Sequence, residues 1–143
     1  FAGELGHLPV SNSNLKCACG LTGCLESVAG GRAFETNFQR KHGLEMSGQE
    51  IADLARAGDS RATEAFSELG LAVGEVIGQL DTAFDLDTVV IGGGFGSTFD
   101  LWIDQAHKAY SATLVGAASR TKANILLGSL GQNAQILGAA TLR

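Results

Sequence analysis

The sequence lacks the long apolar segments and leader patterns that mark membrane and secreted proteins. No apolar run approaches the ~18 residues of a membrane-spanning helix, so we expect no association with a membrane. No basic leader precedes a short apolar stretch, so we expect no signal peptide. Charged residues make up 17% of the 143 residues and apolar residues 45%, a balance typical of one globular domain with a buried core.

Positive charge is also scarce, and it is scattered along the chain. Ten Lys and Arg residues stand against fifteen Asp and Glu, which gives a formal net charge of −5. A nucleic-acid-binding domain usually gathers its basic residues on one face to neutralise phosphates. We therefore expect this chain to bind no nucleic acid by itself.

The cysteines are few and clustered, since Cys17, Cys19 and Cys24 are the three in the chain. A disulfide framework would normally use an even number of cysteines spread along the sequence. Clustered thiols in a reducing cytoplasm indicate a metal instead, and we expect the protein to be cytoplasmic.

A nearby histidine completes a set of four metal ligands. His7, Cys17, Cys19 and Cys24, called here the Cys3His cluster, suit tetrahedral zinc. All four coordination positions would be filled, so the predicted zinc is structural and not catalytic. The alternative is three unrelated thiols and an unrelated histidine. The spacing C-x-C-x4-C beside a histidine is rare by chance and favours zinc.

Two glutamates lie close to this cluster in the sequence, Glu4 before it and Glu26 after it. Taken separately, each would be an ordinary exposed charge. Beside a rigid metal loop, their carboxylates suit an array of sugar hydroxyls, because they are strong hydrogen-bond acceptors. If zinc takes one nitrogen of His7, the other can bond a ligand hydroxyl. His42 and His107 have no such neighbours, and we expect them at the surface.

The apolar spacing predicts a helix-rich chain. A first helix is expected over about 25–41, although Gly30 weakens it. Ser47 and Glu50 form a capping-box pattern at the start of a second helix. Apolar residues recurring at three- and four-residue steps predict one long buried helix over about 60–84.

Three glycines fall four residues apart on the long helix, at positions 70, 74 and 78. Glycine costs helix stability, so each must allow another element to pack closely, or else contact a ligand directly. The first interpretation is the more common one.

The second half of the chain alternates between strands and helices. A buried strand is expected over 88–91, a helix from about Thr98, a second strand over 123–127, and a last helix capped by Asn133. This order predicts a parallel α/β unit with right-handed crossovers.

A glycine-rich turn, Gly92, Gly93 and Gly94, follows the first of these strands. A strand, a glycine turn and a helix N-terminus can cradle a nucleotide, because backbone amides approach the ligand closely. The segment is neither G-x-G-x-x-G, since Ser97 replaces the last glycine, nor a P-loop. A tight structural turn without a ligand remains the alternative.

Two of these segments resemble the signature of the ROK family, which contains bacterial sugar kinases and sugar-responsive repressors. Residues 3–7, Gly-Glu-Leu-Gly-His, resemble its E-x-G-H element. Residues 17–26 resemble its C-x-C-G-x-x-G-C-x-E element, and the resemblance continues to the C-terminal Leu-Gly-Ala-Ala stretch.

The resemblance implies the two-lobed actin/hexokinase-like ATPase fold with RNase H-like halves. This chain would be a partial C-terminal lobe of the α/β class, helix-rich with a few parallel strands and a zinc-bound loop. The family implies zinc at the Cys3His cluster, a sugar held partly by residues matching Glu4, His7 and Glu26, and ATP beside the glycine turn. We divide the single domain 1–143 into a zinc and sugar region, 1–31, and a helical and α/β core, 32–143.

Two functions are compatible with this resemblance. The first is ATP- and Mg²⁺-dependent phosphorylation of a hexose or N-acetylhexosamine, favoured by the triple glycine. The alternative is a NagC-like regulator with a helix-turn-helix N-terminal to this segment. A zinc-stabilised interaction module without a small ligand is a third reading. A glycosidase built on the two glutamates is set aside, because a closed Cys3His metal does not suggest that chemistry.

The catalytic groups expected of a ROK kinase are not in this segment. The family's D-x-G-G phosphate-binding segment and its catalytic aspartate would precede Phe1, so we expect the isolated chain to be inactive and assign it no catalytic residue. The opening strands of the lobe would precede it too. We expect an exposed sheet edge or apolar surface, which a second copy in a homodimer could cover.

Overall fold

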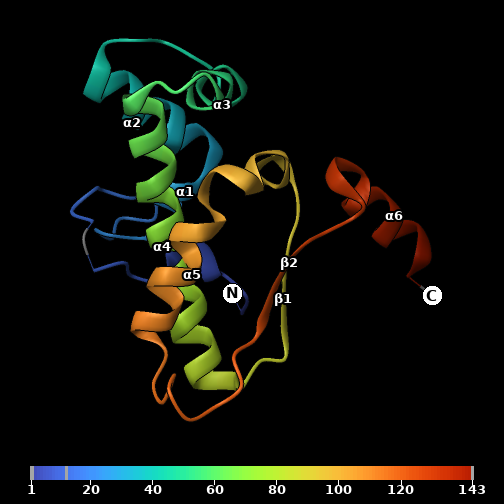
Figure 1. Cartoon of the computed structure of the whole chain (residues 1–143). Coiled ribbons are helices and arrows are strands. Elements are labelled where there is room, and N and C mark those ends of the chain that lie inside the picture. Colours follow the sequence, from blue (N-terminus) through green and yellow to red (C-terminus); the bar gives the residue numbers. More distant parts are fainter. Residues whose placement is uncertain (1, 12, 143) are drawn as a thin grey trace.

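The computed structural model describes residues 2–11 and 13–142. The first element, η1, is the 3-10 helix Leu5–His7. Four helices follow, and two short strands lie among the helices of the second half of the chain (Figure 1). In chain order these are α1 Leu25–Ala29, α2 Gly31–His42, α3 Gly48–Arg56, α4 Ser60–Phe84, β1 Thr88–Ile91, η2 Gly94–Thr98, α5 Phe99–Thr113, β2 Asn124–Leu127, η3 Gly131–Asn133 and α6 Ala134–Thr141.

The predicted first helix is two helices, because Gly30 interrupts it. Its backbone is extended (φ −67°, ψ 138°), so α1 ends there and α2 starts in a new direction. The prediction of one helix over 25–41 was therefore wrong. The capping box at the start of α3 is confirmed, since Ser47 and Glu50 bond each other's backbone amides.

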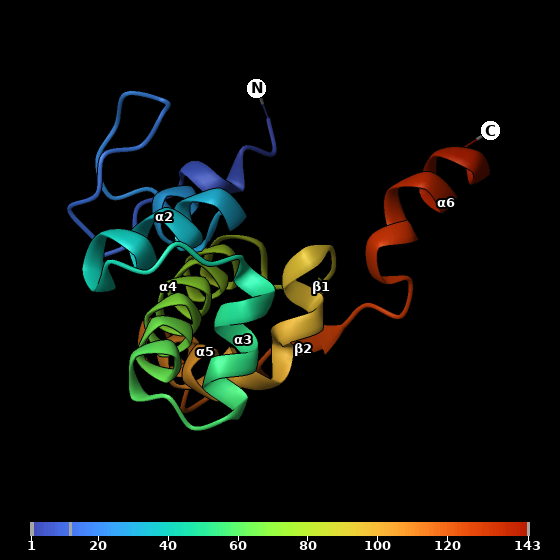
Figure 2. The ribbon, with the colours of Figure 1, turned by 90° about the horizontal axis from the view of Figure 1, so that it is seen from above.

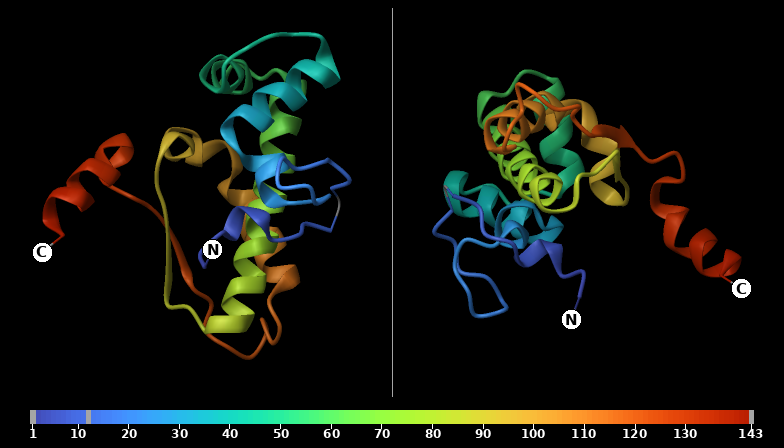
Figure 3. Two further views of the ribbon diagram at one scale, coloured as in Figure 1. Left: turned by 180° about the vertical axis from the view of Figure 1, so that it is seen from behind. Right: turned by 90° about the horizontal axis from the view of Figure 1, so that it is seen from below.

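The long helix α4 forms with the predicted bounds and packs along α5 (Figures 1 and 3). A Cβ atom on Gly70 would lie 2.4 Å from the carbonyl oxygen of Trp102, and one on Gly74 would lie 2.1 Å from that of Ala106. One on Gly78 would lie 2.8 Å from the Thr113 side chain. The three glycines let the two helix backbones approach, which confirms the packing interpretation.

The α4–α5 pair forms the centre of the hydrophobic core. The largest fully buried side chains include Trp102 and Tyr110 from α5 and Phe66 and Leu69 from α4. Helices α2 and α3 cover one end of this pair, with Phe34, Phe38 and Ile51 buried against it.

The two strands pair in parallel, as predicted, and α5 lies between them in the sequence. Thr88 pairs with Asn124 and Ile91 with Leu127. The prediction of a buried strand was wrong for β1, whose residues alternate between exposed and half-buried positions and whose Val90 is 63% exposed. A two-stranded sheet needs further strands or a covering helix on such a face.

The C-terminal helix α6 projects away from the rest of the molecule, as Figures 2 and 3 show from opposite sides. Its Ile136 is 72% exposed and its Leu137 45% exposed. Asn133 occupies the predicted N-cap position, but its side chain makes no capping hydrogen bond, so the position was predicted correctly and the hydrogen bond was not. The exposed apolar residues of the sheet and α6 form the expected uncovered surface.

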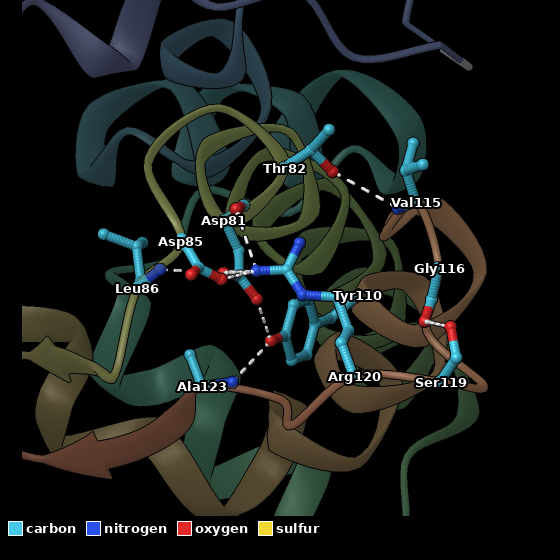
Figure 4. A network of polar contacts seen from close by, with 10 residues as sticks. All are labelled: Asp81, Thr82, Asp85, Leu86, Tyr110, Val115, Gly116, Ser119, Arg120 and Ala123. Atoms are coloured by element: carbon cyan, nitrogen blue, oxygen red, sulfur yellow. Dashed lines mark hydrogen bonds and ion pairs between the residues drawn. The ribbon is translucent and has the colours of Figure 1, made fainter.

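A buried polar network fixes the other end of α4 (Figure 4). The Tyr110 hydroxyl donates to Asp81, which is fully buried, and accepts a bond of 2.7 Å from the Ala123 amide. Arg120 bonds Asp81 at 3.0 Å. Burial opposes ionisation of Asp81, but the Tyr110 hydroxyl, the Leu86 amide and the Arg120 charge together hold the pKa of its carboxyl below the ordinary value. The network ties α4, α5 and the start of β2 together.

Candidate metal centre and ligand groove

Backbone pairing brings the ligands of the Cys3His cluster together. Pro9 forms an antiparallel bridge with Cys24, and Lys16 forms one with Thr22. The Cys17 amide donates to the Leu21 carbonyl at 2.8 Å, which closes a tight turn. Thus residues that lie up to seventeen positions apart converge, and the four ligand atoms all lie within 4.8 Å of one another.

Two of the distances between these atoms fit tetrahedral zinc. Zinc–sulfur bonds of about 2.3 Å and zinc–nitrogen bonds of about 2.0 Å place two sulfurs about 3.8 Å apart and a sulfur and a nitrogen about 3.5 Å apart. The Cys19 and Cys24 Sγ atoms are 3.7 Å apart. The Cys17 Sγ and His7 Nδ1 atoms are 3.6 Å apart. These two distances match a tetrahedral site, and the four ligand atoms, all within 4.8 Å of one another, need only small movements to surround one metal.

The three thiols differ in their surroundings. Cys24 is buried and Cys17 is nearly so, whereas Cys19 is exposed. Burial, reinforced by the neighbouring thiols, raises the pKa of Cys24 to about 12. The Leu21 amide lowers the pKa of Cys19. A metal must displace the Cys24 proton, so metal affinity is expected to weaken in acid.

The histidine of the cluster faces two groups at once. Its Nδ1 atom points to Cys17, and its Nε2 atom lies 3.7 Å from the carboxylate of Glu4. The nitrogen that a metal would not use is thus directed at a predicted sugar-binding residue. Glu4 is exposed, with a side chain 61% accessible.

The carboxylate of Glu26 lies between two glycines. A Cβ on Gly30 would approach its Oε1 atom to 2.4 Å, and one on Gly6 would approach its Oε2 atom to 3.2 Å. Any larger residue at position 30 would displace this carboxylate. The absence of a side chain at Gly30 therefore leaves room for the carboxylate of Glu26 and for its backbone carbonyl, 2.6 Å from the same Cβ position.

His7 and Glu26 line one hollow of about 830 Å³ between the cysteine loop and α2. The structure thus places Glu26 with His7 on the wall of this hollow, whereas Glu4 contacts His7 at 3.7 Å but does not line the hollow. Further polar side chains line the same hollow: Asn14, Lys16, Ser27, Arg32, Thr36, Asn37 and Arg40. These residues were not predicted from the sequence; the i, i+4, i+8 spacing of Arg32, Thr36 and Arg40 on one helix face is the signal that could have indicated them.

The glycine turn lies at a second hollow, on the other side of the start of α2. Gly93 has a positive φ of 76°, which glycine adopts without strain, and the turn leads through η2 into α5. Cβ atoms on Gly92 and Gly94 would meet no atom within 4 Å. Gly94 lines this second hollow of about 420 Å³ with residues of α2, α3 and η2: Gly31, Glu35, Ser47, Gly48, Gln49, Phe95, Ser97 and Thr98.

Two long-range contacts fix the walls of this second hollow. Glu35 accepts a hydrogen bond of 2.8 Å from the Gly48 amide, which joins α2 to α3. Arg56 donates to the Ser97 carbonyl at 3.0 Å and to Asp100 at 2.9 Å, which joins α3 to the end of η2. The hydrogen bond from Arg56 holds the pKa of Asp100 below its ordinary value. No local pattern predicts these pairs, because their members are far apart in the sequence.

The two other histidines lie outside the cluster. His107 is exposed, and His42 is half-buried with its ring 4.7 Å from that of Phe38. Among the residues that the structure describes, no helix is long and apolar enough to cross a membrane.

Comparison with known proteins identifies the family. The model of the ROK family matches residues 1–143, and the chain belongs to this family. It is 31% identical to a glucokinase of Streptomyces coelicolor, over 99% of this chain and 50% of that protein. It is 33% identical to an N-acetyl-D-glucosamine kinase of Haemophilus influenzae, over 99% of this chain and 49% of that protein. The chain spans about half the length of these relatives.

The solved structures give the same result for the fold. A ROK family glucokinase from Streptomyces griseus, in complex with glucose and AMPPNP, matches with a TM-score of 0.83 and 31% identity, over 97% of this chain and 50% of that one. A ROK family transcriptional regulator, a homologue of the E. coli MLC protein, matches with a TM-score of 0.76 and 22% identity, over 87% and 34%. The expected actin/hexokinase-like kinase fold, helix-rich with a small parallel sheet, is confirmed.

Proposed function

We propose that the chain is the metal-stabilised, sugar-binding half of a ROK sugar kinase, with zinc at the Cys3His cluster. The observation that carries this proposal is the position of His7, whose Nδ1 atom faces the cluster and whose Nε2 atom faces Glu4. A metal on Nδ1 would fix the ring, and with it the edge of the hollow that Glu26 also lines.

The proposed ligand of the larger hollow is a monosaccharide, either a hexose or an N-acetylhexosamine. Glu4, His7 and Glu26 would accept or donate hydrogen bonds to its hydroxyl groups, as carboxylates and a metal-bound imidazole do. The relatives support this class of ligand, because they include a glucokinase and an N-acetyl-D-glucosamine kinase.

The proposed ligand of the smaller hollow is the nucleotide, ATP with Mg²⁺. The turn Gly92–Gly94 is exposed and has no atom within 4 Å of its Cβ positions, which suits a close approach of phosphates or ribose to its backbone. Helix α2 begins between the two hollows, with Gly31 on the nucleotide side and Arg32 on the sugar side. The two proposed ligands would therefore lie on either side of one helix start.

A ROK regulator remains the second candidate, because the chain shares its fold with a transcriptional regulator of the family. The triple glycine and the 31–33% identity to kinases favour the kinase.

We further propose a cytoplasmic protein, a division into regions 1–31 and 32–143, and a homodimer that covers the apolar residues of β1, β2 and α6.

The first test is the metal content of the purified chain, measured by elemental analysis with thiol titration before and after chelation. We expect about one zinc per chain.

The second test uses a longer protein that includes the other half. Glu26→Ala and Glu4→Ala should each weaken binding of glucose or N-acetylglucosamine without loss of zinc, while the exposed Asp104→Ala on α5 should change neither. Loss of metal in the glutamate variants would show that these carboxylates are structural.

A further inference from the structure

The Cys3His cluster is made of two different contact pairs. One pair joins the Cys17 sulfur to the His7 ring, at 3.6 Å. The other joins the sulfurs of Cys19 and Cys24, at 3.7 Å. The Cys17 sulfur also lies within 4.8 Å of both other sulfurs, but it faces the His7 ring, so Cys19–Cys24 is the thiol pair in direct sulfur–sulfur contact.

The two thiols of this pair are suited to successive steps of an oxidation. Cys19 is exposed, whereas Cys24 is 1% exposed and Cys17 9%. Cys19 lies in the tight turn that the Cys17 amide closes on the Leu21 carbonyl, while the backbone bridge to Pro9 holds Cys24. An oxidant in solution therefore reacts first with the exposed Cys19, and the buried Cys24 is the second thiol to react.

The distance that separates the pair is small enough for local movement to close. A disulfide requires sulfurs about 2.05 Å apart, so the approach needed is about 1.7 Å. Gly20 and Gly23 separate the two cysteines, with φ of +94° and +80°. Gly20 has no atom within 4 Å of its Cβ position, so the loop can adjust there, whereas Gly23 is fixed by backbone hydrogen bonds to Val10 and Leu15.

We propose that Cys19 and Cys24 are a reversible oxidation site, at which a peroxide forms a disulfide and releases the metal. This inference rests on the zinc site proposed above. The Cys19 thiolate attacks one oxygen of hydrogen peroxide, the O–O bond breaks, and hydroxide leaves and takes a proton to become water. The Cys24 sulfur then attacks the sulfenic acid of Cys19 and gives up its proton. The S–S bond forms, the S–O bond breaks, and a second hydroxide leaves as water.

Oxidation removes two of the four metal ligands. His7 and Cys17 remain, and two ligands do not satisfy a zinc ion that prefers four. The metal would then leave, and the loop would be held by its backbone pairing alone. Because His7 also lines the ligand hollow, the same event would weaken sugar binding, and a thiol reductant with added zinc would restore it.

The experiment treats the zinc-loaded chain with hydrogen peroxide and follows three quantities. A chromogenic chelator measures released zinc, thiol titration counts free cysteines, and proteolytic mass mapping identifies the linked pair. We expect one zinc released per chain, a fall from three thiols to one, and a peptide that joins Cys19 to Cys24. Dithiothreitol and zinc should reverse all three changes.

Two variants test the choice of pair without depending on the metal. In zinc-free protein, Cys17→Ser should still form the intramolecular disulfide, and Cys24→Ser should not. A disulfide that includes Cys17, or Cys19 sulfinic acid with zinc retained, overturns the inference and leaves the metal site intact. A chain that binds no zinc before peroxide is added refutes the metal site itself and, with it, the proposed release.

Discussion

The substitution Gly74→Ala tests the closest contact in the core. Gly74 lies in the interior of α4, where a Cβ atom would come 2.1 Å from the carbonyl oxygen of Ala106 and 2.7 Å from its Cα. Non-bonded carbon atoms pack best at about 3.5–4.0 Å, so α5 would have to move by about 1 Å. The obstacle is helix backbone, which cannot move away as a flexible side chain could.

Two effects of opposite sign decide the outcome. Alanine is favoured over glycine in a helix interior by about 1 kcal/mol. Overpacking of a core usually costs about 1–3 kcal/mol, and a clash with backbone lies at the upper end of that range. The net expectation is a loss of about 2 kcal/mol in the free energy of unfolding. For a chain of this length, that corresponds to a fall in Tm of roughly 6–10 °C.

Chemical denaturation and calorimetry would measure this loss. The control is Gly31→Ala, at the first position of α2, where the nearest atom to a new Cβ is a Phe95 ring carbon at 3.9 Å. We expect Gly31→Ala to be neutral or slightly stabilising. An equal or higher stability for Gly74→Ala would show that the two helices do not pack through this glycine, and the reasoning would be refuted.

Three further predictions concern the metal, a helix cap and acid stability. Cys19→Ser should release zinc and disorder residues 7–26; equal zinc content and an unchanged Tm would contradict it. Ser47→Ala should cost about 1 kcal/mol in denaturant unfolding, because it removes the side-chain cap of α3; no measurable change would refute the cap. The pKa of Asp81 is lower in the folded protein than its unfolded value of about 4, so its stabilising effect is present above that pH and is lost as the pH falls below it. The denaturant concentration at the midpoint of unfolding should therefore decrease as the pH falls below about 4, and a midpoint that stays constant there would contradict the role of Asp81.

Local patterns in the sequence predicted the elements whose causes are local. The periodic apolar residues of α4, the capping box at Ser47 and the β-branched run of β1 each depend on neighbours within a few positions. The Cys3His ligands were also predictable, because the chemistry of a zinc ligand set depends on residue type and spacing. One failure was local as well, whereas the wrong prediction of burial for β1 was not, because burial depends on what packs against the strand. Gly30 was counted as a weak helical residue, although its extended backbone ends α1.

Only the tertiary structure decided how these segments meet. The sequence showed three glycines on one face of α4. Only the packing showed that the backbone of α5 lies against them. The pairing of Arg56 with Asp100 and of Asp81 with Tyr110 joins residues 44 and 29 positions apart. The physical reason is that residue type and spacing determine helices, strands and ligand chemistry. The walls of a hollow and the partners of a buried charge depend on long-range contacts, which form only when the chain folds.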